Sequence, residues 1–206
     1  MIELRNIALG FEDRMLFRGG EMDLRGVWPL LGLNGSGKTT LLRMLAGFLP
    51  PLEGVFSVRG RILYQPQKPL LFSMSALENA MLGMVRKDEQ KALQMLAEMG
   101  LADFARTKAK TLSGGEQARL CLCRSLLAGG DVVLMDEPFA AVDAASVDRL
   151  ALYLKDFCVG AGATLLVAVH SVHTAALFSE QCLLIRDEKL VTCETEKARE
   201  YLVSSI

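Results

Sequence analysis

Residues 32–39 constrain the fold of this chain more than any other segment, because they read Gly-Leu-Asn-Gly-Ser-Gly-Lys-Thr and match the pattern G-x-x-x-x-G-K-[ST]. An apolar run at 27–31, continuous enough to form a buried strand, comes directly before them. Apolar residues with helical spacing follow, at Leu41, Leu42, Leu45 and Ala46. This strand–loop–helix context predicts a loop whose backbone N–H groups and helix N-terminus bind phosphate.

The predicted loop assigns roles to individual side chains. Lys38 is expected to reach the β- and γ-phosphates of a nucleotide, and the Thr39 hydroxyl to bind Mg²⁺. We expect Lys38 to pack against nothing in the empty site. The alternative is an ordinary glycine-rich turn, which the filled positions and the flanking elements disfavour. The residues predicted to contact nucleotide here are Gly32, Asn34, Gly35, Ser36, Gly37, Lys38, Thr39 and Thr40.

Two carboxylates follow the apolar run at 132–135, within the sequence Asp-Glu-Pro at 136–138. They end a predicted strand at the edge of the sheet where the phosphate loop should also lie. Asp136 is placed to hold Mg²⁺, as in other P-loop NTPases, and Glu137 can polarise an attacking water. The alternative is an acidic pair that faces solvent at a strand end.

Short apolar runs that alternate with helical patterns predict an α/β fold with a mainly parallel sheet. Apolar residues within the first 25 positions suggest an antiparallel β layer at the N-terminal edge. Pro29 should stand at the first residue of its strand or at a break, because proline cannot donate to a central ladder. The strands that we predict outside the N-terminal layer are 27–31, 132–135, 164–169, 182–185 and 190–192.

The segment 70–112 lacks a strong strand pattern and predicts a small α-helical subdomain inserted into the core. Helices are expected over 75–84 and 88–99, the second with Leu93, Leu96 and Met99 on one face and Gly100 as its stop. The chain is therefore predicted to be a single domain, 1–206. Its nucleotide-binding core would be 1–69 and 113–206.

Composition excludes several classes of protein. The net charge is −1 and Lys and Arg are scattered, which argues against a nucleic-acid partner. No run approaches the ~18 uninterrupted apolar residues of a spanning helix, and the first residues lack the pattern of a signal peptide. We therefore expect the polypeptide to stay in the cytoplasm. The five cysteines include no C-x-x-C pair and are predicted to be buried, reduced thiols.

Residues 112–117, Leu-Ser-Gly-Gly-Glu-Gln, narrow the class further. They resemble the signature of ABC ATPases, usually written L-S-G-G-Q, and precede the acidic strand end as that family requires. In this order and spacing the motifs resemble the ABC ATPase family over essentially the whole chain. The resemblance implies that Ser113, Gly114, Gly115 and Glu116 close over the ATP of a second ABC ATPase subunit, giving a head-to-tail homodimer with two ATP molecules between its halves.

The same resemblance implies roles for four more residues. Gln67 looks like the glutamine that senses Mg²⁺ and the γ-phosphate, with Gln65 as a competitor. His170 looks like the switch histidine, with His173 as its rival, and the two could also be read as a metal pair. Phe11 stands where the family stacks an aromatic ring on adenine, the alternative being a plain core residue. Residues 140–143, Ala-Ala-Val-Asp, stand where the family more often has S-A-L-D. Asp143 matches the aspartate of that motif, whereas Ala140 replaces its serine and lacks the hydroxyl.

The resemblance implies an ATP-hydrolysing subunit that uses ATP and Mg²⁺ to power an ABC transporter at the inner face of the cell membrane. Its partner would be a transmembrane permease, and a solute-binding protein could be a further partner. The sequence Glu-Pro-Phe at 137–139 favours import of a small solute or ion. The alternatives are a soluble ABC ATPase acting on ribosomes or nucleic acid, and a P-loop kinase.

An apolar stretch at 70–77 suggests where a membrane partner would dock. Leu71, Phe72 and Met74 are expected to help form a groove for a short helix of the permease. The alternative is that this stretch only packs the core of the helical subdomain.

Overall fold

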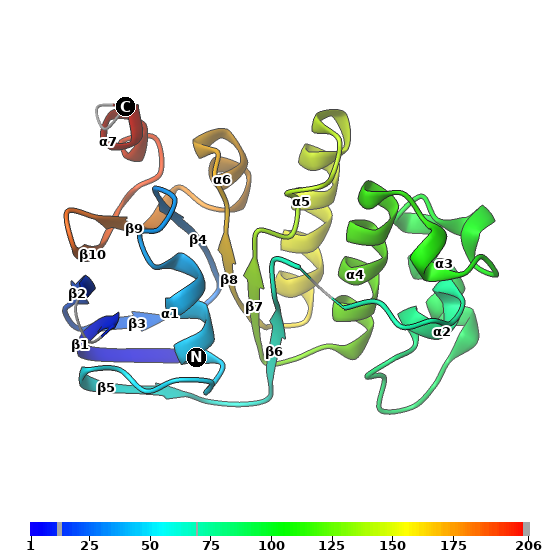
Figure 1. Ribbon diagram of the computed structural model, residues 1–206, viewed down its shortest axis with the longest axis horizontal. Helices are drawn as coiled ribbons and strands as arrows, with labels where there is room; N and C mark the ends of the chain where they lie inside the picture. Colours follow the sequence, from blue (N-terminus) through cyan, green and yellow to red (C-terminus); the bar gives the residue numbers. More distant parts are fainter. Residues whose placement is uncertain (12–13, 69, 204–206) are drawn as a thin grey trace.

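The computed structural model describes residues 1–11, 14–68 and 70–203. The predicted domain limits at residues 69 and 206 lie outside the described residues. Figure 1 shows the antiparallel strands from the N-terminal part at one end of the molecule and the helical subdomain at the other, with the parallel strands between them.

Five parallel strands form one side of the sheet, in the order β9-β4-β8-β7-β6, with β6 at its edge. Their residues are Val27–Gly32 (β4), Ile62–Gln65 (β6), Val132–Asp136 (β7), Thr164–Ala168 (β8) and Gln181–Arg186 (β9). Four of these were predicted, and β6 was not. Because the strands are parallel, the ends of β4, β6 and β7 reach the same edge of the sheet.

An antiparallel layer continues the same sheet. Three of its strands lie within the first 25 residues, where the layer was predicted: Ile2–Phe11 (β1), Arg14–Gly19 (β2) and Met22–Leu24 (β3). The fourth, Glu53–Val58 (β5), was not predicted. Strand β1 pairs antiparallel with β2, β3 and β5. Strand β10 (Lys189–Glu194) joins the layer to the parallel strands, since it lies between β2 and β9.

Helices cover both faces of the parallel strands. Helix α1 (Lys38–Leu45) packs on one face, with Val132 and Leu134 of β7 among the residues beneath it. Helices α4 (Gly114–Ala128), α5 (Ala144–Gly160) and α6 (Val172–Phe178) contribute to the core on the other face, which includes Val133 and Met135. Alternate residues of β7 thus pack into the cores on opposite faces of the sheet, which explains its unbroken apolar sequence.

The helical subdomain contains α2 (Ala76–Ala80) and α3 (Glu89–Glu98). Helix α2 is shorter than the predicted 75–84 and begins after Ser75, whose hydroxyl accepts from the Glu78 N–H. Helix α3 was predicted to bury Leu93, which is wrong, because Leu93 is 40% exposed. The buried face instead comprises Ala92, Met95, Leu96 and Met99, four positions with helical spacing. Gly100, with φ of 67°, ends the helix as predicted.

The expectation that Pro29 begins its strand or stands at a break is wrong, since it is the third residue of β4. The Leu30 carbonyl accepts from the Val169 N–H, on the β8 side. Backbone groups alternate in direction along a strand, so the Pro29 nitrogen points toward β9. The β4–β9 ladder begins only at Leu30, and the missing N–H therefore costs no ladder bond.

In the part of the chain that the structure describes, no helix is both long and apolar enough to cross a membrane. All five cysteines are free thiols, four of them buried and Cys193 half-buried. Cys182 and Cys193 are opposite each other on β9 and β10, with their sulfurs 3.5 Å apart. Burial raises the pKa of Cys182 to about 12, so that it stays a neutral thiol.

Candidate nucleotide site

The loop between β4 and α1 contains the predicted phosphate motif. Gly35 and Gly37 have φ of 76° and 107°, a left-handed conformation that side chains disfavour. A Cβ at Gly37 would lie 3.1 Å from the Phe17 ring, and one at Gly32 would lie 2.6 Å from Ser36 Oγ. The glycines are therefore needed for both the backbone conformation and the close packing of the loop.

The Lys38 ammonium is buried in the structure, at 5% exposure. Its Nζ donates to the carbonyls of Gly32 and Leu33 at 2.8 and 3.3 Å and lies 3.9 Å from Oε1 of Glu137. The expectation that Lys38 packs against nothing is therefore wrong. Burial lowers the pKa of Lys38, and the nearby carboxylates of Glu137 and Asp136 oppose this effect.

Glu137 connects the three residues predicted to be catalytic. It follows β7 with φ of 50°, a strained conformation for a non-glycine residue, and its N–H donates to the Ala168 carbonyl at 3.2 Å. Its Oε2 accepts from Gln67 Nε2 at 2.5 Å and lies 2.6 Å from His170 Nε2. Segments far apart in sequence thus meet on one carboxylate oxygen at the edge of the sheet.

Asp136, the last residue of β7, is 1% exposed, and neither of its carboxylate oxygens has a hydrogen-bond partner of ordinary geometry among the described residues. Burial raises its pKa, while the nearby Thr39 hydroxyl and the Lys38 ammonium lower it. A buried carboxylate without a hydrogen-bond partner beside a hydroxyl is a pair of oxygen ligands of the kind that Mg²⁺ prefers. The residues present therefore fit this cation.

The phosphate loop borders a pocket of about 540 Å³ together with Gln67, Glu137 and His170. Phe11 reaches it from the end of β1 and is 63% exposed, so it is not a core residue. Arg14 and Leu16 of β2 also line the pocket, and the sequence motifs gave no indication of either. The lining residues are Phe11, Arg14, Leu16, Asn34, Gly35, Gly37, Lys38, Thr39, Thr40, Gln67, Glu137 and His170.

The signature residues lie at the start of α4, whose N-cap is Ser113. The Ser113 hydroxyl accepts from the Glu116 N–H at 3.4 Å, and Glu116 Oε2 accepts from the Ser113 N–H at 2.7 Å. Asp143 caps α5, where it accepts from the Ser146 N–H at 3.0 Å. Among the described residues, none of Ser113, Gly114, Gly115, Glu116 and Asp143 lines the pocket at the phosphate loop. Gly114 instead lines a neighbouring pocket of about 270 Å³, which Gln67 and Glu137 also border. The signature residues therefore do not contribute to the phosphate-loop pocket of their own chain.

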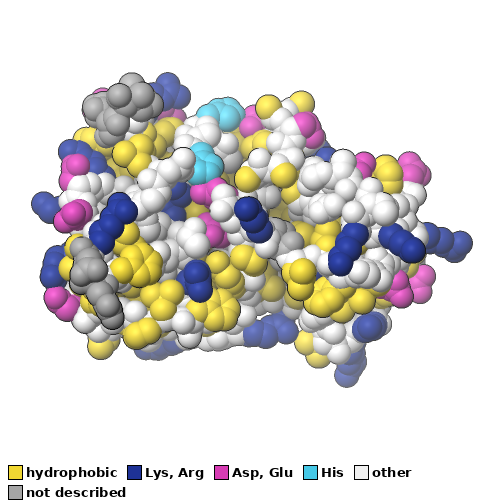
Figure 2. Space-filling view, viewed as in Figure 1, with side chains coloured by type: hydrophobic (Ala, Val, Ile, Leu, Met, Phe, Trp, Pro, Cys, Tyr) yellow, Lys and Arg dark blue, Asp and Glu magenta, His cyan; other side chains and the backbone are white. Residues whose placement is uncertain are grey.

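The rival residues have other partners. Gln65 is 2% exposed and accepts from the Ser125 hydroxyl at 2.7 Å. His173 pairs with Asp148 at 3.0 Å rather than with the carboxylate that His170 contacts. Within residues 1–11, 14–68 and 70–203 no cluster of three His, Cys, Asp or Glu side chains could hold a metal ion. Figure 2 shows both histidines on one face, the lower one beside acidic side chains near the centre.

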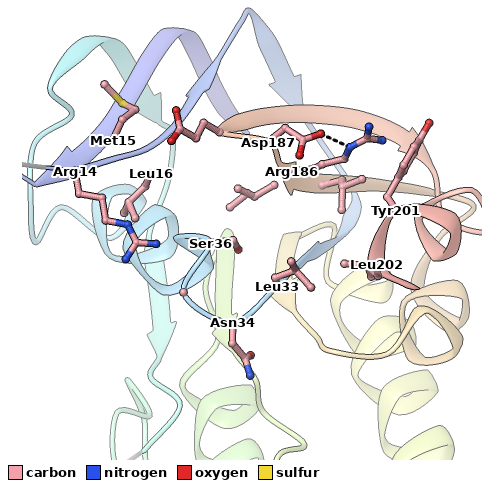
Figure 3. A pocket seen from close by; sticks show the side chains of 14 residues that line it. Arg14, Met15, Leu16, Leu33, Asn34, Ser36, Arg186, Asp187, Tyr201 and Leu202 are labelled. Atoms are coloured by element: carbon pink, nitrogen blue, oxygen red, sulfur yellow. Dashed lines mark hydrogen bonds and ion pairs between the residues drawn. The ribbon is translucent and has the colours of Figure 1, made fainter. Parts of the chain in front are cut away.

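A second pocket, of about 240 Å³, lies on the flank of the phosphate loop (Figure 3). Its walls come from β2, the turn between β9 and β10, and helix α7 (Ala198–Val203). The Arg186 guanidinium lies 3.7 Å from the centroid of the Tyr201 ring, and its Nε donates to Asp187 at 2.6 Å. Leu33 and Leu202 line this pocket together, so the end of the described chain borders the phosphate loop.

The comparisons with known proteins identify the family. The model of the ABC transporter family matches residues 21–140, more than half of the chain. The chain belongs to the ABC transporter family. It is 36% identical over 202 residues to an aliphatic sulfonates import ATP-binding protein, SsuB 2, of Nocardia farcinica, covering 93% of this chain and 82% of the relative. A taurine import ATP-binding protein, TauB, of Jannaschia sp. is 33% identical over 209 residues, covering 89% and 77%.

Solved structures of ABC proteins show the same fold. A dimeric ATP-binding cassette in a post-hydrolysis state with ADP and Pi has a TM-score of 0.81 at 23% identity, covering 95% of this chain and 99% of that one. An Atm1-family ABC exporter with ATP bound has a TM-score of 0.83 at 20% identity, covering 97% and 40%. The predicted fold class and the predicted family, that of an ATP-binding subunit with ATPase activity, are confirmed.

Proposed function

We propose that this ABC subunit hydrolyses ATP at the pocket beside Glu137, as one half of a homodimer, to power import through a separate membrane permease. The contact of Gln67 and His170 with the same oxygen of Glu137 carries this proposal. It puts a carboxylate, an amide and an imidazole together at the phosphate loop, where the terminal phosphate of ATP would lie.

Lys38 would exchange its loop carbonyls for the β- and γ-phosphates when ATP binds. It would also leave Oε1 of Glu137, from which it is now 3.9 Å away. Glu137 could then accept a proton from a water aligned with the γ-phosphate. His170 and Gln67 would hold the carboxylate in place through its other oxygen.

Thr39, Asp136 and Gln67 would hold Mg²⁺, since they supply a hydroxyl, an unpartnered buried carboxylate and an amide oxygen. Gln67 donates to Glu137 through Nε2, which leaves its amide oxygen to act as a ligand. The cation would neutralise charge on the phosphates. Asp136 would thereby obtain a counter-charge to replace that of Lys38, which would turn to the phosphates.

The second phosphate-binding element would act on the partner subunit. Ser113 and Gly114 are exposed and Gly115 and Glu116 are half-buried at the start of α4, where the backbone N–H groups favour an anion. Because these residues do not line the pocket at the phosphate loop of their own chain, two copies arranged head to tail would complete two ATP sites. Asp143, at the start of α5, would border these shared sites, and Phe11 would lie beside the adenine ring.

We further propose that the transported solute is a small alkyl sulfonate, because the relatives are named as importers of aliphatic sulfonates and taurine. Those names favour import over the alternative of a soluble ABC ATPase acting on ribosomes or nucleic acid. A permease and a solute-binding protein would select the solute, with this subunit at the cytoplasmic face of the membrane.

Reconstitution tests this function. The chain is co-purified with its permease from membranes and placed in vesicles together with the solute-binding protein, with taurine as the probe and sulfate and an amino acid of similar size as competitors. We expect ATP-dependent uptake of taurine coupled to phosphate release, and neither activity with Glu137→Gln. Phosphate release without stimulation by any sulfonate would overturn the solute class, and absence of a co-purifying permease would overturn transport.

A further inference from the structure

We propose that Arg124 and Ser125, two neighbouring residues of α4, are positioning residues that hold Gln67 against Glu137. This inference rests on the proposed role of Gln67 and Glu137 in hydrolysis. Figure 1 shows α4 beside the end of β6, where the chain leaves the sheet toward the helical subdomain. Arg124 and Ser125 bind the chain on the two sides of Gln67 at this crossing.

The Ser125 hydroxyl binds the chain before Gln67. It donates to Oε1 of Gln65 at 2.7 Å, and the two residues are 7% and 2% exposed. Gln65 is the last residue of β6, two positions before Gln67. A buried hydrogen bond between two side chains fixes their separation, because breaking it would leave polar groups unsatisfied away from water.

The Arg124 guanidinium binds the chain after Gln67. Its Nη1 donates to the Leu70 carbonyl at 2.8 Å. Leu70 is 68% exposed, so its own side chain contributes little to holding its backbone in place. Together, the two bonds fix the chain on both sides of the residue whose amide contacts Glu137.

The same helix begins with the signature residues at Ser113. A helix rises 1.5 Å per residue, so Ser113 and Ser125 are about 18 Å apart along α4. A rigid helix that shifts when its N-terminus binds a phosphate would move Gln67 relative to Glu137. Arg124 and Ser125 thus connect the half-site offered to the partner subunit with the hydrolytic site of the same chain.

A single variant and a double variant test the bond before Gln67. Ser125→Ala alone leaves Gln65 buried without its partner, whereas Ser125→Ala with Gln65→Met removes both polar groups at similar volume. We expect Ser125→Ala to lower kcat of the full chain about tenfold, with the KM for ATP within twofold, because small displacements of a catalytic group are costly. Because the double variant also lacks the bond, its kcat should stay low. Recovery of kcat in the double variant would assign the loss in Ser125→Ala to an unpaired buried group and would overturn a role for the bond. An unchanged kcat in Ser125→Ala would overturn the proposal.

Arg124→Gln and Arg124→Lys test the bond after Gln67. Arg124→Gln should lower kcat without changing the KM, and Arg124→Lys, which can still donate to a carbonyl, should restore much of it. Arg149→Gln is the matched control, because Arg149 Nη1 also donates to a backbone carbonyl at 2.8 Å, that of Glu98, away from Gln67. Equal effects of Arg124→Gln and Arg149→Gln on kcat would contradict a positioning role.

The outcome separates this inference from the proposed function. If Glu137→Gln still hydrolyses ATP at the wild-type rate, the proposed site is wrong. If Glu137→Gln is inactive while the Arg124 and Ser125 variants keep full kcat, only the positioning role is wrong. A lower melting temperature with unchanged kcat would assign Arg124 and Ser125 to stability alone and would also overturn the inference.

Discussion

His170 Nε2 lies 2.6 Å from Oε2 of Glu137, the oxygen that also accepts from the Gln67 amide. The loop after β8 and the loop after β6 therefore meet on the residue that follows β7. Glu137 keeps its other oxygen toward Lys38. Each partner can be removed separately, which makes the proposed roles testable one at a time.

Glu137→Gln should reduce ATP turnover by ~10² or more, the usual scale for loss of a general base. The amide keeps the size of the side chain but cannot accept the proton of water. ATP should still bind, as measured by calorimetry, while phosphate release falls. Glu89→Gln, at an exposed position in α3, is the control for removing one acidic charge. Hydrolysis by Glu137→Gln at a near wild-type rate would refute the assignment.

Lys38→Ala should weaken ATP binding by about tenfold or more, because a hydrogen bond to a charged group contributes ~1.5–3 kcal/mol. The fold should survive, since the change removes a buried ammonium whose pKa is lowered mainly by burial. Calorimetry measures the affinity and thermal unfolding the stability. Unchanged affinity would argue against the phosphate loop, and Arg43→Ala, at the end of α1, controls for loss of a cation from the same helix.

Asp136→Asn should abolish the Mg²⁺ dependence of ATP binding without destabilising the nucleotide-free protein. Burial raises the pKa of Asp136, so the folded state binds its proton more tightly than the unfolded state. The carboxylate therefore costs stability as pH rises above its unfolded pKa, and a neutral amide avoids that cost. We expect an equal or higher melting temperature at neutral pH. A clear loss of stability, or ATP binding that still responds to Mg²⁺, would count against a cation site.

The Glu137→Gln chain should convert from monomer to dimer when ATP is added, because ATP bound across two half-sites stabilises the assembly by mass action. Ser113→Arg should prevent this by placing a long side chain at the anion-binding start of α4. Light scattering gives the mass in each case. Monomers that persist at saturating ATP would mean that the partner is a different ATPase or that Ala140 weakens the interface.

Phe72→Asp should detach the subunit from its permease, since it would place an unpaired charge in an apolar contact. The structure removes Leu71 from the predicted docking residues, because it is only 6% exposed and belongs to the subdomain core. Phe72 is 45% exposed and remains a candidate. Asn79 holds the Phe72 backbone in place through two hydrogen bonds.

A pull-down with the permease and a phosphate-release assay on the isolated subunit decide the role of Phe72. Leu93→Asp is the matched control, at 40% exposure on α3. Binding retained by Phe72→Asp would rule out docking at this residue, and loss of hydrolysis as well would mean that Phe72 supports the subdomain itself.

The sequence by itself determined the phosphate loop, the acidic strand end, the signature and most of the parallel strands. These features are local, because glycine spacing constrains the backbone directly and an unbroken apolar run has to be buried on both faces. Sequence periodicity placed Leu93 on the buried face of its helix, which is wrong. In a short helix the apolar residues are compatible with more than one choice of buried face. Periodicity also missed β5 and β6, whose few residues give no clear pattern.

Only the tertiary structure decided which side chains meet. The parallel register of β6, β7 and β8 brings Gln67, Glu137 and His170 to one edge of the sheet. It also buries Lys38 against loop carbonyls and pairs Gln65 with Ser125. Such contacts depend on how distant strands and helices are stacked, and no spacing within a single segment encodes that arrangement.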